Sequence, residues 1–291
     1  MKITVKAAAK INLMLDILEK LPNGYHSLWM IMQSVSVYDR VTVEKKTSGG
    51  ITISCSEDGI PTDEKNIAYK AAEKFFDFCG EEDRNIHITI EKNIPHAAGL
   101  AGGSADGAAV ITALNSLYEK NLPVKKLCQI GVKVGADVPF CIQGGTMLAQ
   151  DIGQVLSQLP DMPSCFFVLA KPQQGVSTAE AYAAVDSMNL RHPDAHTMFR
   201  SVVDGDLNGI AKSLGNVFEQ AVDVHERVSI KEIMRNNDAM GCCMSGSGPT
   251  VFGIFENSEN AEKCAQELSK KIKGITVHVC TPAEYGCEIE K

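Results

Sequence analysis

Two charged residues stand inside apolar segments of this sequence of 291 residues, and their types suit phosphoryl chemistry. Lys10 follows three alanines and precedes Ile-Asn-Leu, and Asp137 lies in the run Gly-Ala-Asp-Val-Pro-Phe. A buried carboxylate must be paired with an opposite charge or change its pKa. If the fold brings the two together, Lys10 would keep Asp137 ionised and stabilise charge on a transferring phosphoryl group. A helix cap or turn is the alternative role for Asp137, and the sequence leaves both open.

The strongest local pattern is IPHAAGLAGGSADGAA, residues 94–109. Its glycines permit positive φ angles and leave room for a ligand close to the backbone. The amides of such a loop, followed directly by a helix N-terminus, form a concave anion site that suits a polyphosphate. A tight strand-to-helix turn with Ser104 as N-cap is the structural alternative. The segment is neither a GxxxxGK[ST] P-loop nor a GxGxxG dinucleotide fingerprint, which disfavours a Rossmann enzyme.

Two further turns carry residues suited to a ligand. The run MSGSGPT, residues 244–250, has more small residues than a hairpin needs, which favours a turn that faces a ligand over a plain hairpin. The turn Asn-Gly-Tyr-His ends on Tyr25 and His26, which together suit stacking on and hydrogen bonding to a planar base. A turn with a half-buried Tyr25 is the alternative. The other histidines form no metal-ligand spacing.

The elements that must position these residues follow from the hydrophobic periodicity. Alternating β-branched residues predict strands at 3–9, 11–18, 29–37, 41–45, 51–55, 85–92, 146–150, 165–171, 241–244, 251–255 and 275–280. Helical spacing predicts helices at 66–79, 104–118, 124–134, 178–188, 195–204, 207–214, 217–236 and 259–271. Because strands and helices mix without strict βαβ alternation, we expect an α+β fold. The two prolines of LPDMPS, residues 159–164, predict a boundary between domains 1–160 and 161–291.

Composition narrows the class of protein. The formal net charge is −8, with 28 Lys and Arg against 36 Asp and Glu, which argues against binding nucleic acid or an anionic membrane. The ten cysteines form no CxxC pair and sit largely in apolar runs, so we expect reduced thiols. The N-terminus lacks a signal-peptide pattern, and no apolar run approaches the roughly 18 residues of a membrane span. We therefore expect a cytoplasmic protein, whose oligomeric state the sequence does not indicate.

Taken together, the motifs resemble the galactokinase–homoserine kinase–mevalonate kinase–phosphomevalonate kinase (GHMP) superfamily. The resemblance rests on AKINLMLDI, NGYHSL, the glycine-rich loop, GADVPF and GCCMSGSGPTVF, in this order, and covers about residues 6–279. The combination of Lys10, Asn12, GYH at 24–26 and GADVP at 135–139 is narrower, and resembles members acting on a cytidine diphosphate derivative of methylerythritol. The fold this implies is an N-terminal α+β nucleotide domain followed by a ferredoxin-like α+β domain, with the active site between them.

The resemblance also implies an activity and roles for individual residues. ATP, with Mg²⁺, would donate its γ-phosphoryl group to the 2-hydroxyl of the methylerythritol moiety, on the non-mevalonate route to isoprenoids. Asp137 matches the catalytic carboxylate and Lys10 its charge-stabilising partner. Substrate contacts are implied for Asn12, Tyr25, His26 and Tyr182. The implied ATP phosphate loop comprises Pro95, His96, Ala97, Ala98, Gly99, Leu100, Ala101, Gly102, Gly103, Ser104 and Ala105.

One residue departs from this pattern, and two other functions stay open. Asp106 directly follows the loop and would repel phosphate unless it faces away or helps to hold Mg²⁺, so no metal ligand is assigned. A superfamily kinase acting on mevalonate or homoserine is one alternative, although neither substrate requires the Tyr25–His26 pair. A catalytically silent, nucleotide-gated regulator is the other, although it would not require both Lys10 and Asp137.

Overall fold

Two long antiparallel strands organise the first sheet. In the computed structural model, which describes residues 1–290, β1 (Lys2–Lys20) and β2 (His26–Lys45) pair along almost their whole length. The sequence predicted two shorter strands in each of these segments, and that prediction is wrong. The register shifts at Ala8/Ala9 and at Asn12/Met14, so bulges bend the β1–β2 ladder without ending it.

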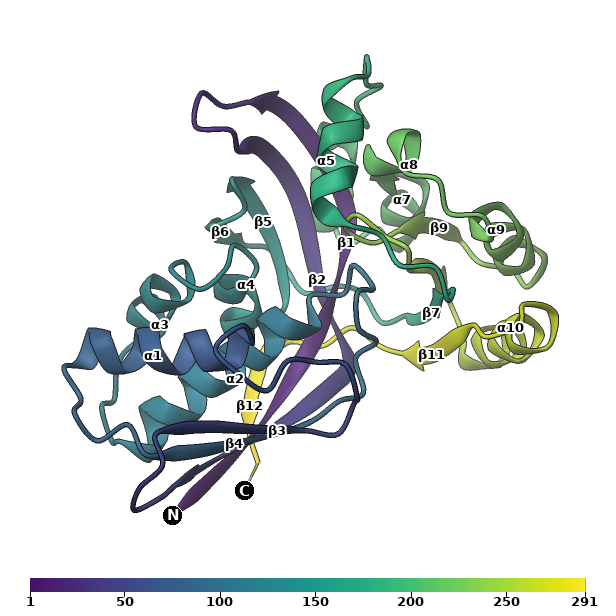
Figure 1. The fold of residues 1–291 in the computed structure, drawn as a ribbon. Helices are drawn as coiled ribbons and strands as arrows, with labels where there is room; N and C mark the ends of the chain where they lie inside the picture. Colours follow the sequence, from purple (N-terminus) through teal and green to yellow (C-terminus); the bar gives the residue numbers. More distant parts are fainter. Residues whose placement is uncertain (291) are drawn as a thin grey trace.

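The first sheet has eight strands, and four helices cover one of its faces (Figure 1). Its main order is β12-β1-β2-β4-β3, with β5 and β6 beyond β2 and β8 beside β1. The remaining strands are β3 (Ile51–Cys55), β4 (Ile86–Glu91), β5 (Thr146–Asp151), β6 (Val155–Gln158), β8 (Gly215–Asn216) and β12 (Cys287–Ile289). The helices are α1 (Ile67–Cys79), α2 (Gly102–Leu117), α3 (Val124–Gly131) and α4 (Val138–Gln143).

Helix α2 lies at the centre of this domain, between α1 and the strands β1 and β2. Its run Ala-Ala-Val-Ile, residues 108–111, is fully buried, because both sides of the helix are covered. Helix α1 begins at Asn66, whose side chain accepts a hydrogen bond from the amide of Ala68 at 2.8 Å. Helix α2 is therefore packed on one side against α1 and on the other against the two long strands of the sheet.

The second sheet has four antiparallel strands in the order β11-β7-β10-β9. Two helices, α9 and α10, pack against this sheet. In chain order the strands and helices of this unit are β7 (Phe166–Lys171), α9 (Arg227–Asn236), β9 (Gly241–Met244), β10 (Val251–Phe255), α10 (Ser258–Lys271) and β11 (Thr276–Cys280). This is the βαββαβ pattern of a ferredoxin-like unit, which confirms the predicted fold class. Four shorter helices precede α9, namely α5 (Thr178–Asp186), α6 (Ala195–Val203), α7 (Leu207–Lys212) and α8 (Phe218–Ala221).

Other differences from the predicted elements have local causes. The single helix expected at 217–236 is two helices, α8 and α9, because Val222 is extended and its carbonyl accepts from Arg227 Nη1 at 2.8 Å. Helix α4 and the strands β6, β8 and β12 were not predicted. Both β8 and β12 pair with β1, so later parts of the chain return to the first sheet and the two termini lie close together (Figure 1). The division at residue 160 stays a prediction.

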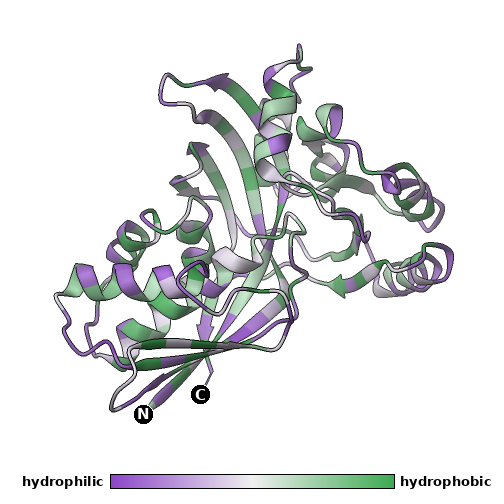
Figure 2. Ribbon diagram, in the orientation of Figure 1, coloured by the Kyte–Doolittle hydropathy of each residue, from purple (hydrophilic) through white to green (hydrophobic). Residues whose placement is uncertain are grey.

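Hydropathy follows this layering. Apolar residues concentrate in the strands and on the inner sides of the helices, whereas polar residues gather on the outer helix faces (Figure 2). All ten cysteines are free, and burial raises the pKa of the Cys141 and Cys243 thiols well above the ordinary value. Within residues 1–290, no helix combines the length and the apolar character that crossing a bilayer requires.

Candidate active site

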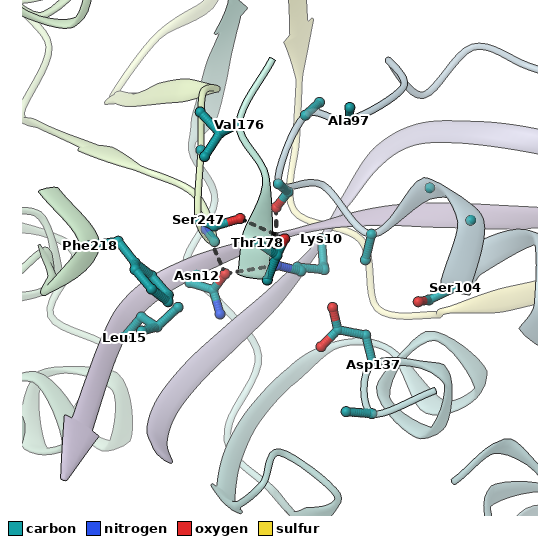
Figure 3. Close-up of a pocket in the computed structure, with 18 of the residues that line it drawn as sticks. Lys10, Asn12, Leu15, Ala97, Ser104, Asp137, Val176, Thr178, Phe218 and Ser247 are labelled. Carbon is teal, nitrogen blue, oxygen red and sulfur yellow. Dashed lines mark hydrogen bonds between the residues drawn. The ribbon is translucent and has the colours of Figure 1, made fainter. Parts of the chain in front are cut away.

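A cavity of about 700 Å³ lies between the first sheet and the later half of the chain. Lys10, Asn12 and the hairpin residues Tyr25 and His26 line it from the first sheet, together with the glycine-rich loop. The later half contributes Val176, Thr178, Tyr182, Phe218 and the turn 246–248 (Figure 3). The structure thus gathers the predicted motifs, which are far apart in sequence, around one space.

Lys10 is held by a buried network at the centre of this cavity. Its ammonium group donates to Asn12 Oδ1 at 2.8 Å and to the carbonyl oxygen of Gly99 at 3.0 Å. Asn12 Oδ1 also accepts from the amide of Gly246 at 3.0 Å, and Asn216 Nδ2 donates to the carbonyl oxygen of Gly246 at 2.8 Å. One charge is therefore fixed where the first strand, the glycine-rich loop and the last turn meet (Figure 3).

Asp137 lies on the opposite side of the same space. It precedes α4 as its N-cap residue, but its side chain makes no capping bond, so the cap alternative explains its position and not its carboxylate. The carboxylate points toward the gap beside Lys10 (Figure 3). Within residues 1–290, Lys10 and Asp137 form no ion pair with each other. They line the same cavity and face each other across a gap (Figure 3). Such a gap leaves room for a ligand between the carboxylate of Asp137 and the ammonium group of Lys10.

The glycine-rich loop ends in a left-handed residue that starts α2. Ala101 has φ 58° and is the N-cap, so the alternative that made Ser104 the N-cap is wrong. Ser104 lies in the first turn and lines the cavity. The first helical amides have no carbonyl partner four residues earlier, which leaves them free to bind an anion. Leu100 and Ala105, also predicted to bind ATP, are buried outside the cavity lining.

Close contact between two turns fixes the shape of this loop. Gly99 has φ 73°, and a Cβ there would lie 2.2 Å from the carbonyl oxygen of Ser245. The Ser245 hydroxyl in turn donates to the Gly99 carbonyl at 2.9 Å. Only glycine fits at position 99, because any larger residue would overlap the MSGSGPT turn. The turn therefore packs closely against the glycine-rich loop, and packing explains the small residues at this contact.

Sequence reasoning missed Asp39 and Lys92, which form a buried charge cluster with Asp106 beneath the loop. Lys92 pairs with Asp39 and, at 2.8 Å, with Asp106. Asp39 also accepts from the amides of Asn93 at 2.6 Å and Ile94 at 2.8 Å, where the chain enters the loop. Burial opposes the charge on Lys92, but the two carboxylates outweigh it and raise the pKa of Lys92.

Asp106 faces this cluster and is absent from the cavity lining. Burial raises the pKa of Asp106 to about 7. The positive charge of Lys92 opposes this rise, and the negative charge of Asp39 adds to it. Of the two expectations for Asp106, the one in which it turns away from the phosphates agrees with this placement.

Aromatic side chains line the far end of the cavity. The rings of His26 and Tyr182 stack at 4.6 Å with an interplanar angle of 20°, and Tyr182 packs edge-on against Phe218 at 5.0 Å. Burial raises the pKa of Tyr182 to about 12, so its hydroxyl stays protonated at neutral pH. Tyr25 also lines the cavity and is 59% exposed, which leaves its ring free to cover a planar group.

Oxygen donors near the loop suit a nucleotide-bound metal better than a resident one. Within the described residues there is no group of three or more His, Cys, Asp or Glu side chains that could hold an ion. Mg²⁺ in nucleotide sites uses one or two protein oxygens together with phosphates and water. The hydroxyl of Ser104, which lines the cavity in the first turn of α2, fits that requirement.

Comparison with known proteins agrees with this geometry. Models of the N-terminal and C-terminal domains of GHMP kinases match residues 66–145 and 198–274. Homoserine kinase from Cytophaga hutchinsonii, 23% identical, superposes with a TM-score of 0.80 over 99% of this chain and 97% of its own, which supports the fold alone. The fold and the cavity thus define a small-molecule kinase of the GHMP class.

Similarity to individual proteins is more specific. The 4-diphosphocytidyl-2-C-methyl-D-erythritol kinase of Caldicellulosiruptor bescii is 46% identical over 275 residues, covering 93% of this chain and 96% of the relative. The protein of that name from Clostridium perfringens is 41% identical over 278 residues, 94% of this chain and 96% of its own. A crystal structure of 4-(cytidine 5'-diphospho)-2C-methyl-D-erythritol kinase, 28% identical, covers 96% of this chain and 99% of its own with a TM-score of 0.78. The chain belongs to the 4-diphosphocytidyl-2-C-methyl-D-erythritol kinase family.

Proposed function

We propose that the protein transfers the γ-phosphoryl group of ATP to the 2-hydroxyl of 4-diphosphocytidyl-2-C-methyl-D-erythritol. The observation that carries this proposal is the layout of one cavity. The loop residue Ser104 lies on one side of the Lys10–Asp137 gap, and Phe218, against which Tyr182 of the His26–Tyr182 stack packs, lies on the other side (Figure 3). That layout suits a donor polyphosphate, a reacting hydroxyl and a planar base, in this order.

Each residue of the gap has one task in the reaction. Asp137 accepts the proton of the attacking hydroxyl, since its carboxylate has no other hydrogen-bond partner within residues 1–290. Lys10, held by Asn12 and Gly99, stabilises the charge on the transferring group without having to reorient. Phosphoryl transfer requires mainly such positioning and charge stabilisation.

The polyphosphate of ATP would bind to the loop amides and to the N-terminus of α2. Ser104, in the first turn of α2, would hold the accompanying Mg²⁺, which neutralises phosphate charge when it is bound. Local donors are needed here because the chain as a whole is acidic, with a net charge of −8. The buried Asp106 does not disturb this arrangement, because it pairs with Lys92.

A coupled assay of ADP release tests the proposal. Purified protein is given ATP and Mg²⁺ with 4-diphosphocytidyl-2-C-methyl-D-erythritol, mevalonate or homoserine as acceptor. Of the three acceptors, we expect only the cytidine compound to be phosphorylated. We also expect cytidine nucleotides to bind to the protein and protect it. Absence of turnover with a folded protein, or preferred turnover of mevalonate or homoserine, would refute the proposal.

A further inference from the structure

The carboxylate of Asp186 lies against the imidazole of His26. Oδ1 of Asp186, the last residue of α5, is 2.6 Å from His26 Nε2. Its other oxygen, Oδ2, binds the ammonium group of Lys20 at the end of β1. The imidazole is only 8% exposed, whereas Asp186 lies outside the cavity lining. Asp186 therefore contacts His26, which lines the cavity, but does not line the cavity itself.

This contact decides which ring nitrogen carries the proton. Hydrogen bonds from Lys20 and His26 hold the pKa of Asp186 below its usual range, so the carboxylate is ionised at neutral pH. An ionised carboxylate only accepts hydrogen bonds, so His26 Nε2 must be the donor. In the neutral imidazole, Nδ1 is then an acceptor with a free lone pair.

The surroundings keep the ring in this orientation. Stacking on Tyr182, which itself packs against Phe218, opposes a ring flip that would exchange the two nitrogens. Nδ1 has no hydrogen-bond partner among residues 1–290, although His26 lines the cavity. With Nε2 engaged by Asp186, Nδ1 is the ring nitrogen of His26 that remains available to a ligand in the cavity.

We propose that Asp186 is a positioning residue that sets the tautomer of His26 and thereby selects a base with an exocyclic amino group. The inference rests on the proposed function. Cytosine presents an amino N–H donor at its 4-position, which matches the Nδ1 lone pair. Uracil presents a carbonyl oxygen there, which would face that lone pair without a proton between them.

A simple mechanical role for Asp186 gives different expectations. Through Lys20 and His26, Asp186 also joins the β1–β2 hairpin to α5. If that were its whole role, losing either contact would weaken cytidine and uridine substrates equally. The Lys20→Met variant removes only the Lys20 contact, whereas Asp186→Asn keeps the shape and reverses the hydrogen-bond polarity. The two variants together separate the roles.

The test compares these variants in kinetics and in ¹⁵N spectra of the histidine side chains. In Asp186→Asn, the amide N–H donates to Nε2 and moves the proton to Nδ1. We expect kcat/KM for the cytidine substrate to fall about 10- to 100-fold, mainly through KM, with a matching loss of preference over the uridine diphosphate counterpart. In the ligand-free protein, the protonated nitrogen of His26 should change from Nε2 to Nδ1. Lys20→Met should keep the tautomer and the preference.

Two results would overturn the inference. One is an Asp186→Asn variant with an unchanged His26 tautomer and unchanged cytidine preference. The other is a Lys20→Met variant that loses the preference as fully as Asp186→Asn. A wild type without turnover would refute the proposed function instead, while the spectra of the ligand-free protein would still report on the tautomer.

Discussion

The ammonium group of Lys10 lies 3.0 Å from the carbonyl oxygen of Gly99, and this contact joins the first strand to the glycine-rich loop. Asn12 extends the connection to Gly246 in the last turn. Three segments that are far apart in the chain therefore share one buried charge. The position of that charge depends on all three, and this dependence makes the site sensitive to small changes.

Replacing Lys10 with methionine keeps most of the side-chain volume and removes the charge. We expect kcat to fall about 10²- to 10³-fold, because one preorganised donor to the transferring group is lost. The KM for ATP should change less, since the loop amides remain. Steady-state kinetics with both substrates measures this.

Lys6→Met is the matched control on the same strand. Lys6 is partly exposed and faces Tyr38 and Glu290 outside the cavity. Its loss should leave kcat within about twofold, since effects of surface ion pairs are small. Equal activity of Lys10→Met and the wild type would contradict the role of Lys10.

Gly99→Ala tests the contact between the two turns. The new Cβ would meet the Ser245 carbonyl oxygen at 2.2 Å, so the loop must shift. We expect kcat/KM for ATP to fall about 100-fold, the effect of misplacing a binding group by about 1 Å. Gly80→Ala is the control, because Gly80 has φ 62° but no atom within 4 Å of its added Cβ.

The control separates backbone strain from the steric clash. Gly80→Ala should lower the free energy of unfolding by about 1–2 kcal/mol, the strain of a left-handed alanine, and leave kcat/KM unchanged. Urea unfolding and kinetics on both variants check this. A Gly99→Ala enzyme with wild-type kcat/KM would show that the loop tolerates the displacement.

The buried cluster predicts a pH dependence of stability. Burial raises the pKa of Asp106 from 3.8 to about 7, so between these pH values the native state holds a proton that the unfolded chain has lost. The stabilisation from this group is full below about pH 4 and disappears as the pH rises to about 7. Asn cannot ionise, so the Asp106→Asn variant should not lose stability in this way as the pH rises.

Urea unfolding at pH 5 and pH 8 measures the effect. The stability of Asp106→Asn relative to the wild type should increase from pH 5 to pH 8. Glu57→Gln, a change at an exposed carboxylate, should show a constant difference. A constant or decreasing difference for Asp106→Asn would contradict the raised pKa.

Much of this fold is predictable because alternation and helical spacing are local properties of the chain. The strands of the ferredoxin-like unit and its helix α10 follow from them, and Asn66 marks the start of α1. The continuity of β1 does not, because a bulge between paired strands has no local signal. The start of α2 was also missed, since the left-handed Ala101 takes the capping position expected for Ser104.

The site was predictable where residues stand out in their own segment, as Lys10 and Asp137 do. Asp39 and Lys92 did not stand out, because charged residues within or directly after a strand are common, and these two meet only across 53 positions. Asn216 and Asp186 were missed for the same reason, since their partners at 244, 246 and 26 come from distant segments. Sequence patterns therefore single out side chains that line the cavity more readily than the distant residues that hold them in place.

A single-turnover experiment on Asp137→Asn tests the central claim most directly. Radiolabelled ATP, Mg²⁺ and the cytidine substrate are mixed with excess enzyme, and the transfer rate is followed alongside the binding of both ligands. We predict that the variant binds both within about threefold of the wild type but transfers the phosphoryl group at least about 10³-fold more slowly, since the carboxylate acts in the transition state. Transfer at the wild-type rate by Asp137→Asn would contradict the account.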